Sequence, residues 1–272
     1  MEFVKIPPSG VLQPYVKHLW LFSLSGEDLP YSQLFYPYGS HELIFYLENE
    51  ALMNITGCDC WVAQPKSFFS GQFLRPFTLN FSKKCTCIGA SLYPWAGNLL
   101  YNIPSDEFTG QMIPIHEIDK DSRLEEQFSC AENKQALFDI LQEYLESKIC
   151  NKIADKMSCA IAQQIIKAPS WSELNNYLTG NVSVSRRRVE QVFLKNTGLN
   201  MGAFIKKVRF QKSVSLLQNK QRNLTHTALD SGYYDQANFI NEFKYFSGLT
   251  PLQFTKQRSE MKAFLASITA IG

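Results

Sequence analysis

The sequence predicts two folded parts of different class: a β-rich N-terminal domain and an all-α C-terminal domain, joined by helices. In the first 120 residues, short apolar runs alternate with turn residues about every ten positions, as in a sandwich or barrel. From residue 122 onward, apolar residues follow helical spacing instead. A chain of 272 residues can bury two separate cores. We therefore expect three segments, at 1–120, 121–168 and 169–272.

Segment 1–120 is expected to consist mostly of strands. The runs 34–36 and 43–47 are apolar and are bounded by Pro37, Gly39 and Asn49, which are typical turn residues. Further strands are predicted around Ile55 and at 61–62, 67–69, 77–81 and 85–92.

Segment 121–168 is expected to be a helical linker. From Ser122 to about Lys148 the chain has no Pro or Gly, and charged residues alternate with leucines, which predicts one amphipathic helix. A second helix is predicted over about 153–167, because Pro169 disfavours helix just before it. The apolar stripe of the first helix could also pair with a second copy of the chain.

Segment 169–272 is expected to contain only short helices. They are predicted at roughly 171–178, 184–195, 201–218, 224–231, 235–246 and 251–261. The loops are expected at Gly180, Gly198, Asn219, Gly232 and Gly248.

An internal repeat organises this last segment. The stretches 193–199 and 243–249 align at an offset of 50 residues, and Phe204 and Phe254 keep the same offset. Each unit has a helix, a Gly suited to positive φ as a C-cap, and a new helix. In the second unit, Thr250 and Pro251 suit the N-cap and the first helical position. This arrangement predicts two helix-turn-helix units.

Helical spacing gives the second helix of each unit an inner and an outer face. The residues predicted to pack inward are Val189, Val192 and Phe193 in the first unit and Phe239 and Phe243 in the second. Those predicted to point outward are Arg187, Glu190 and Gln191 in the first and Gln236, Ala237 and Asn241 in the second. Arg pairs with guanine, Gln or Asn with adenine, and Glu accepts from cytosine. Glu190 could instead brace Arg186 or Arg187.

The charge distribution points to an anionic partner for the C-terminal segment. Residues 181–272 carry 14 Lys and Arg and 5 Asp and Glu, a net charge of +9, whereas residues 1–180 carry −7. Such asymmetry indicates a polyanion, although a basic surface that is merely solvated remains an alternative. Arg186 and Arg188 flank the first outer face and could reach phosphates.

At these residues the chain resembles the AraC/XylS family of transcription regulators. The resemblance covers about 160–258 and rests on the stretches 185–193, 208–210, 228–239 and 243–251. Three features depart from the family pattern: Met201, Thr227 and a long first turn over 179–184.

The resemblance implies a sequence-specific regulator of double-stranded DNA. Its two reading helices would lie about 34 Å apart and enter successive major grooves. The positions carried over as DNA contacts are Arg186, Arg187, Arg188, Glu190, Gln191, Gln236, Ala237 and Asn241. The stretches 37–45, 69–72 and 88–94 resemble the N-terminal domain of some members, a cupin-like barrel that senses a ligand or mediates assembly.

The N-terminal domain shows no pattern that predicts catalysis, a cofactor or a metal. The sequence lacks a nucleophile elbow, a phosphate-binding Gly-rich loop and a dinucleotide fingerprint. The stretch His41–Phe45 begins like a zinc-protease helix, but Phe replaces the second His. The pairs Cys58/Cys60 and Cys85/Cys87 could hold zinc, whereas the simpler interpretation is small apolar side chains.

No ligand residue is predicted. Trp20, Trp61 and Trp95, with many Phe and Tyr residues, could line an apolar pocket or could simply be core.

We therefore expect a non-enzymatic, homodimeric, cytoplasmic regulator with a small-molecule effector and no membrane contact. No secretory signal or long apolar segment is evident. One alternative is a thiol- or metal-based sensor or enzyme tethered to DNA, and another is a module that binds an acidic protein. The operator, the effector and the choice between activation and repression stay open.

Overall fold

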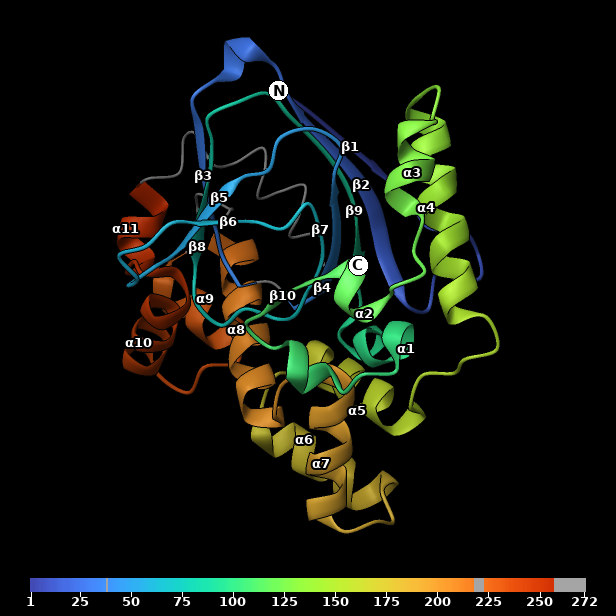
Figure 1. The fold of residues 1–272 in the computed structure, drawn as a ribbon. Coiled ribbons are helices and arrows are strands. Elements are labelled where there is room, and N and C mark those ends of the chain that lie inside the picture. Colours follow the sequence, from blue (N-terminus) through green and yellow to red (C-terminus); the bar gives the residue numbers. More distant parts are fainter. Residues whose placement is uncertain (38, 218–222, 257–272) are drawn as a thin grey trace.

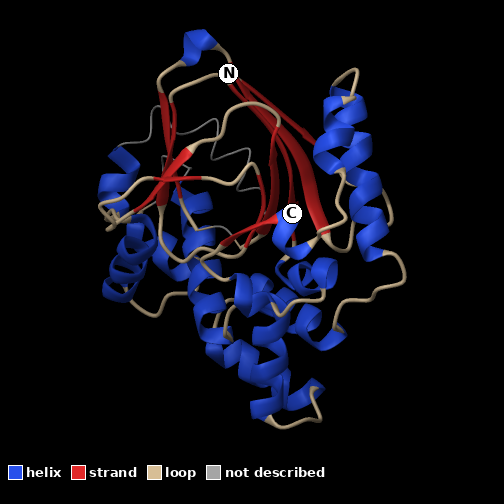
Figure 2. Cartoon of the chain, viewed as in Figure 1, coloured by secondary structure: helices blue, strands red, loops and turns tan. Residues whose placement is uncertain are grey.

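The fold is described from a computed structural model, which describes residues 1–37, 39–217 and 223–256. The N-terminal domain consists of two antiparallel sheets, and helices make up the rest (Figure 2). One sheet has six strands in the order β1 (Glu2–Ile6), β2 (Val16–Leu24), β9 (Cys85–Leu92), β4 (His41–Tyr46), β7 (Ser67–Ser70), β10 (Met112–Pro114). The other has four in the order β3 (Tyr31–Phe35), β8 (Phe77–Phe81), β5 (Leu52–Ile55), β6 (Val62–Ala63). The predicted β-rich domain is confirmed, although β1, β2 and β10 were not among the predicted strands.

The central strands of the six-stranded sheet, β2, β9, β4 and β7, are largely buried on both faces. Because side chains alternate along a strand, Leu19 and Leu21 of β2 join the core beneath the helices. Trp20 and Phe22 of the same strand pack toward the four-stranded sheet. Gly89 of β9 leaves room for the Trp20 ring, since a Cβ there would lie 2.5 Å from Trp20 Cζ2.

Helices cover the outer face of this sheet (Figure 1). They are α1 (Gly97–Tyr101), α2 (Ile115–Ile118), α3 (Leu124–Ser129) and α4 (Lys134–Ile149). Short 3₁₀ turns lie at η2 (Pro94–Ala96) and η3 (Ser105–Phe108), and a third, η1 (Gly26–Asp28), lies in the loop between β2 and β3.

The prediction of a single helix over 122–148 is wrong, because the chain forms α3 and α4 with a break between them. Asn133 starts α4 as its N-cap, where its side chain accepts a hydrogen bond from the Ala136 amide at 3.0 Å. The apolar stripe of α4 is buried in the core of the six-stranded sheet, at Phe138, Leu141 and Leu145. This stripe is therefore not available to a second copy of the chain.

The C-terminal helices lie close to the predicted positions. They are α5 (Lys156–Lys167), α6 (Trp171–Asn181), α7 (Arg186–Thr197), α8 (Met201–Leu217), α9 (Leu224–Asp230), α10 (Gln236–Ser247) and α11 (Pro251–Lys256). The loop predicted at Gly180 is wrong, since α6 continues through this residue, and the turn before α7 shortens to 182–185. The loop at Asn219 and the helix end at 257–261 lie outside the described residues.

Helix α8 joins the two helix-turn-helix units and contributes to both of their cores. Phe204 and Val208 in its first half pack with α5, α6 and α7. Phe210 and Val214 in its second half pack with α9, α10 and α11. Each core also receives a residue of the N-terminal domain, Trp95 in the first and Tyr36 in the second. The N-terminal domain therefore supports both units, along a helix of about 25 Å.

Candidate nucleic-acid interface

Helices α7 and α10 begin and end in the same way, as the repeat predicts. Ser185 caps α7 by accepting from the Arg188 amide at 3.4 Å, and Asp235 caps α10 by accepting from the Asn238 amide at 2.7 Å. Each helix ends at a glycine with positive φ, 80° at Gly198 and 74° at Gly248. The glycine supplies a left-handed C-cap that other residues adopt at a cost. The fifty-residue repeat is therefore a repeat of local structure.

The predicted inner faces are buried. Val189 and Phe193 of α7 are inaccessible to solvent, and the Phe193 ring lies 5.5 Å from that of Phe204. Phe243 of α10 lies 5.1 Å from Phe210 and 5.3 Å from Phe254, measured between ring centroids. The inner-face prediction is confirmed for these residues and for Phe239, while Val192 is only half-buried. Aromatic packing thus fixes which side of each helix faces outward.

All eight residues predicted as DNA contacts are solvent-exposed. Those on α7 are Arg186, Arg187, Arg188, Glu190 and Gln191, and those on α10 are Gln236, Ala237 and Asn241. Glu190 accepts a hydrogen bond from Arg186 Nε at 3.0 Å, one helical turn away, and Arg186 also lies over the Trp171 ring at 5.6 Å. An exposed pair of this kind adds little stability but orients the arginine. Of the two roles considered for Glu190, the structure shows the bracing of Arg186.

A groove beside α7 extends the basic surface onto α1 and the segment before α5. Its α7 side carries Arg188, Gln191 and Lys195, and its other side carries Asn98 and Lys152. Lys152 Nζ donates to the backbone carbonyls of Leu99 and Leu100 at 2.9 and 3.1 Å. Charge patterning does not reveal this second side of the groove, because its residues lie within 1–180, where the net charge is negative.

Polar contacts hold the turn after α7 against the N-terminal domain. Gln72 Nε2 donates to the Thr197 carbonyl at 2.5 Å, and Thr109 Oγ1 donates to the Gly198 carbonyl at 2.5 Å. Lys207 Nζ of α8 donates to Gln72 Oε1 at 3.1 Å and to the Phe73 carbonyl at 2.9 Å. We call the side chains of Gln72, Thr109 and Lys207, with the oxygens that accept from them, the interdomain lock.

Lys207 of the interdomain lock is fully buried. Burial, helped by the charge of Lys17, holds the pKa of Lys207 well below its ordinary value. Breaking the lock would leave buried polar groups without partners, so the two domains are firmly coupled in this conformation.

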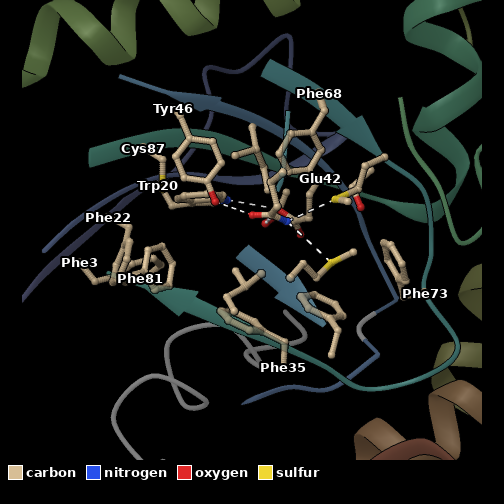
Figure 3. A pocket seen from close by; sticks show the side chains of 18 of the residues that line it. Phe3, Trp20, Phe22, Phe35, Glu42, Tyr46, Phe68, Phe73, Phe81 and Cys87 are labelled. Atoms are coloured by element: carbon tan, nitrogen blue, oxygen red, sulfur yellow. Dashed lines mark hydrogen bonds between the residues drawn. The ribbon is translucent and has the colours of Figure 1, made fainter. Parts of the chain in front are cut away.

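An apolar cavity lies between the two sheets of the N-terminal domain. Figure 3 shows Glu42 among the aromatic side chains that line it, Trp20 and Phe73 included. Of the tryptophans considered for a pocket, Trp20 lines this cavity, Trp61 is exposed and Trp95 belongs to the first helical core. The cavity adjoins the interdomain lock, because Phe73 is common to both.

The cysteine pairs differ in their surroundings. Cys58 and Cys60 are exposed, whereas Cys85 and Cys87 are buried. A hydrogen bond with Cys85, together with burial, raises the pKa of Cys87 well above its ordinary value, so Cys87 stays a protonated thiol. Within residues 1–37, 39–217 and 223–256, no three His, Cys, Asp or Glu side chains gather as a metal site would require.

His41 has a packing role. Its ring is fully buried, stacks on Phe69 at 5.4 Å and hydrogen-bonds through Nε2 to the Pro94 carbonyl at 3.0 Å. Burial lowers the pKa of His41 to about 3, so the imidazole is neutral at physiological pH. His41 is therefore part of the contact between β4 and η2.

Comparison with known proteins finds matches for two separate stretches of the chain. Residues 178–257 match a family described as a helix-turn-helix domain, and residues 4–114 match a domain of unknown function, DUF6597. An uncharacterized HTH-type transcriptional regulator of Haemophilus influenzae is 29% identical over 120 residues, 44% of this chain and 40% of that protein. The Msm operon regulatory protein of Streptococcus mutans is 28% identical over 96 residues, 35% of this chain and 34% of that protein. The chain thus spans well under half the length of these relatives.

Among solved structures, ToxT from Vibrio cholerae O395 is similar over 88% of this chain and 97% of that one, at 14% identity and a TM-score of 0.43. The matched domain and the two capped units define the C-terminal part as a double helix-turn-helix domain. The resemblance to the AraC/XylS family is confirmed for the helix-turn-helix domain at residues 178–257. Over the described residues, no helix has the length and apolar character needed to cross a membrane.

Proposed function

We propose that the chain is a sequence-specific DNA-binding transcription regulator. The observation that carries the proposal is the pair of equivalent helices, α7 and α10, which bury aromatic faces and expose polar ones. Exposed Arg, Gln and Asn side chains on such helices suit base edges in the major groove. The net charge of +9 over residues 181–272 favours the approach of a polyanion. We propose that α7 and α10 enter successive major grooves.

The proposed roles of the site residues follow from their positions. Arg187, Gln191, Gln236 and Asn241 would read base edges, while Ala237 would leave room for close approach or touch a thymine methyl group. Arg188 would contact phosphate, as would Arg186 in the orientation that Glu190 holds.

We further propose that the N-terminal domain senses a small molecule in its cavity and adjusts DNA affinity. Phe73 supports this coupling, because its ring lines the cavity while its carbonyl accepts from Lys207 of α8. A ligand that displaces Phe73 would disturb the interdomain lock and hence the setting of α8 between the two units. The coupling requires the ligand to bind the locked and unlocked states with different affinity.

The cellular setting and assembly are part of the proposal. We propose a cytoplasmic protein without catalytic activity that acts as a homodimer. The dimer contact would use a surface other than the stripe of α4, because that stripe is buried within the chain.

Selection of bound fragments from random duplex DNA tests the proposed function. The expected result is one enriched motif, bound by the full chain with a log affinity that falls linearly with log salt. Retention of every fragment alike would contradict sequence-specific reading and favour a merely basic surface. No retention at near-physiological salt would contradict DNA binding itself.

A further inference from the structure

The cavity of the N-terminal domain is lined by alternate residues of facing strands. Figure 3 shows Trp20 and Phe22 of β2 and Glu42 of β4 around it. Ile44 of β4 and Phe77 of β8 line it as well. Because the period is two, β2 and β4 send their other residues, such as Leu21 and Leu43, into the separate core beneath α4. The cavity wall is therefore built by the sheets themselves.

The size of the cavity limits the ligand to about one aromatic ring. Its volume is about 130 Å³, close to the roughly 150 Å³ apolar cavity that accepts benzene in an engineered protein. The rings around it would contact the faces of such a ligand, with the offset or edge-to-face geometry that aromatic pairs prefer.

One carboxylate stands in this apolar wall. Glu42 Oε2 accepts from Trp20 Nε1 at 3.2 Å and from Ser91 Oγ at 2.8 Å, and Oε1 accepts from Ser40 Oγ at 2.8 Å. Two carboxylate oxygens offer about four acceptor positions, so these three donors leave capacity for another. Burial raises the pKa of Glu42, because the charged carboxylate is less well solvated there than in water. A further hydrogen-bond donor or a cation beside it would therefore stabilise the charged form.

No described residue that lines the cavity is Lys or Arg. His18 lines it, but burial lowers the pKa of His18 to about 3, so its ring is neutral. Lys5 and Lys17 both act on Glu42 from outside the lining, and Lys17 Nζ donates to the Gly39 carbonyl at 3.3 Å. Among the described residues, the partners of the Gln64 amide nitrogen are the sulfurs of Met53 and Met112, at 3.9 and 3.3 Å. An anionic ligand would thus find neutral donors, such as the Gln64 amide, and a carboxylate of its own sign.

We propose that this cavity binds a small aromatic amine, with the ring between the two sheets and the ammonium group against Glu42. The ammonium supplies the donor that Glu42 can still accept, and the flanking Trp20 and Phe faces attract a cation. The inference rests on the proposed sensing role of the N-terminal domain and assigns the chemical class of its ligand.

Titration calorimetry on the full chain tests the proposal with three probes of one shape and different charge: benzylamine, benzyl alcohol and benzoate. Benzylamine is expected to bind about tenfold or more tightly than benzoate, because a hydrogen bond to a buried charged group contributes that much. Glu42→Gln should lower the benzylamine affinity about tenfold or more and leave the benzyl alcohol affinity nearly unchanged. Glu50→Gln, which neutralises an exposed carboxylate of the same domain outside the cavity, is the matched control and should bind like the parent protein.

A second variant keeps the test decisive if Glu42→Gln does not fold. Ile44→Phe narrows the cavity and leaves the carboxylate in place, so it should weaken all three probes. Three results would each overturn the proposal. They are benzoate binding as tight as benzylamine binding, no binding of any probe, and probe affinities that Ile44→Phe leaves unchanged. DNA binding measured on the same samples separates the two ideas, because a chain that selects DNA but ignores the amine keeps the proposed function and loses only this inference.

Discussion

Phe243→Ala should unfold the second helix-turn-helix unit and spare the first. Phe243 is fully buried, and its ring lies 5.1, 5.6 and 5.3 Å from the rings of Phe210, Phe239 and Phe254. Removing a buried phenyl ring costs about 3–5 kcal/mol, because the transfer free energy is lost and a cavity remains. Since α8 gives separate residues to the two cores, this loss should stay in the second.

Hydrogen exchange followed by mass spectrometry measures that loss segment by segment. About 3–5 kcal/mol corresponds to a fall in protection of roughly 10²–10³-fold or more in α9 and α10. Phe193→Ala, one repeat earlier, is the matched control and should lower protection in α5 and α7 instead. An equal fall in both units for either variant would refute the reasoning, because the two cores would then unfold as one.

Three further predictions concern reading, coupling and pH. Arg187→Ala should weaken binding to the selected DNA by about 1–3 kcal/mol and relax preference at one base position; unchanged preference in a repeated selection would remove Arg187 from the reading face. Gly248→Ala should lower the free energy of unfolding by about 1–2 kcal/mol for the left-handed backbone alone. Gly198→Ala should lower it more, as measured by urea denaturation, because its Cβ would lie 2.8 Å from the Ser105 carbonyl oxygen. Equal losses of stability in the two variants would contradict the tight interdomain contact. His41 has a pKa of about 3 in the folded protein, so below about pH 6.5 the unfolded chain binds a proton that the folded chain does not, and the stability of the unmodified protein falls as the pH drops. His41→Gln removes this group, so the stability lost between about pH 7 and pH 5 should be smaller by roughly 2 kcal/mol. A loss of the same size in the variant would contradict the neutral imidazole.

Buried and exposed faces are predicted best where the apolar residues follow a single period, either helical or strand-like. The inner faces of α7 and α10 follow helical spacing, so Phe193 and Phe243 could be placed in cores without coordinates. Strand β2 was missed because it is buried on both sides: Leu19 and Trp20 are both apolar, and the run shows no alternation. The break before α4 was missed because Asn133 acts through one local hydrogen bond rather than through a Pro or Gly.

The two features that couple the domains could not be predicted from sequence patterns. Gln72 and Lys207 lie 135 positions apart, and each alone resembles a solvated polar residue. The residues that line the cavity alternate along their strands as core residues do. The sequence pattern therefore does not distinguish a cavity from a filled core. Glu42 and Gln64 do interrupt apolar surroundings, and such inward polar residues were the one available signal.

Guanine-methylation interference on the selected DNA tests the paired-helix interface most directly. The proposed function predicts two patches of interference on one face of the duplex, about 10–10.5 base pairs apart from centre to centre. Phe243→Ala should erase one patch and Phe193→Ala the other. A single patch, or two patches on opposite faces of the duplex, would contradict the claim that α7 and α10 read neighbouring major grooves together.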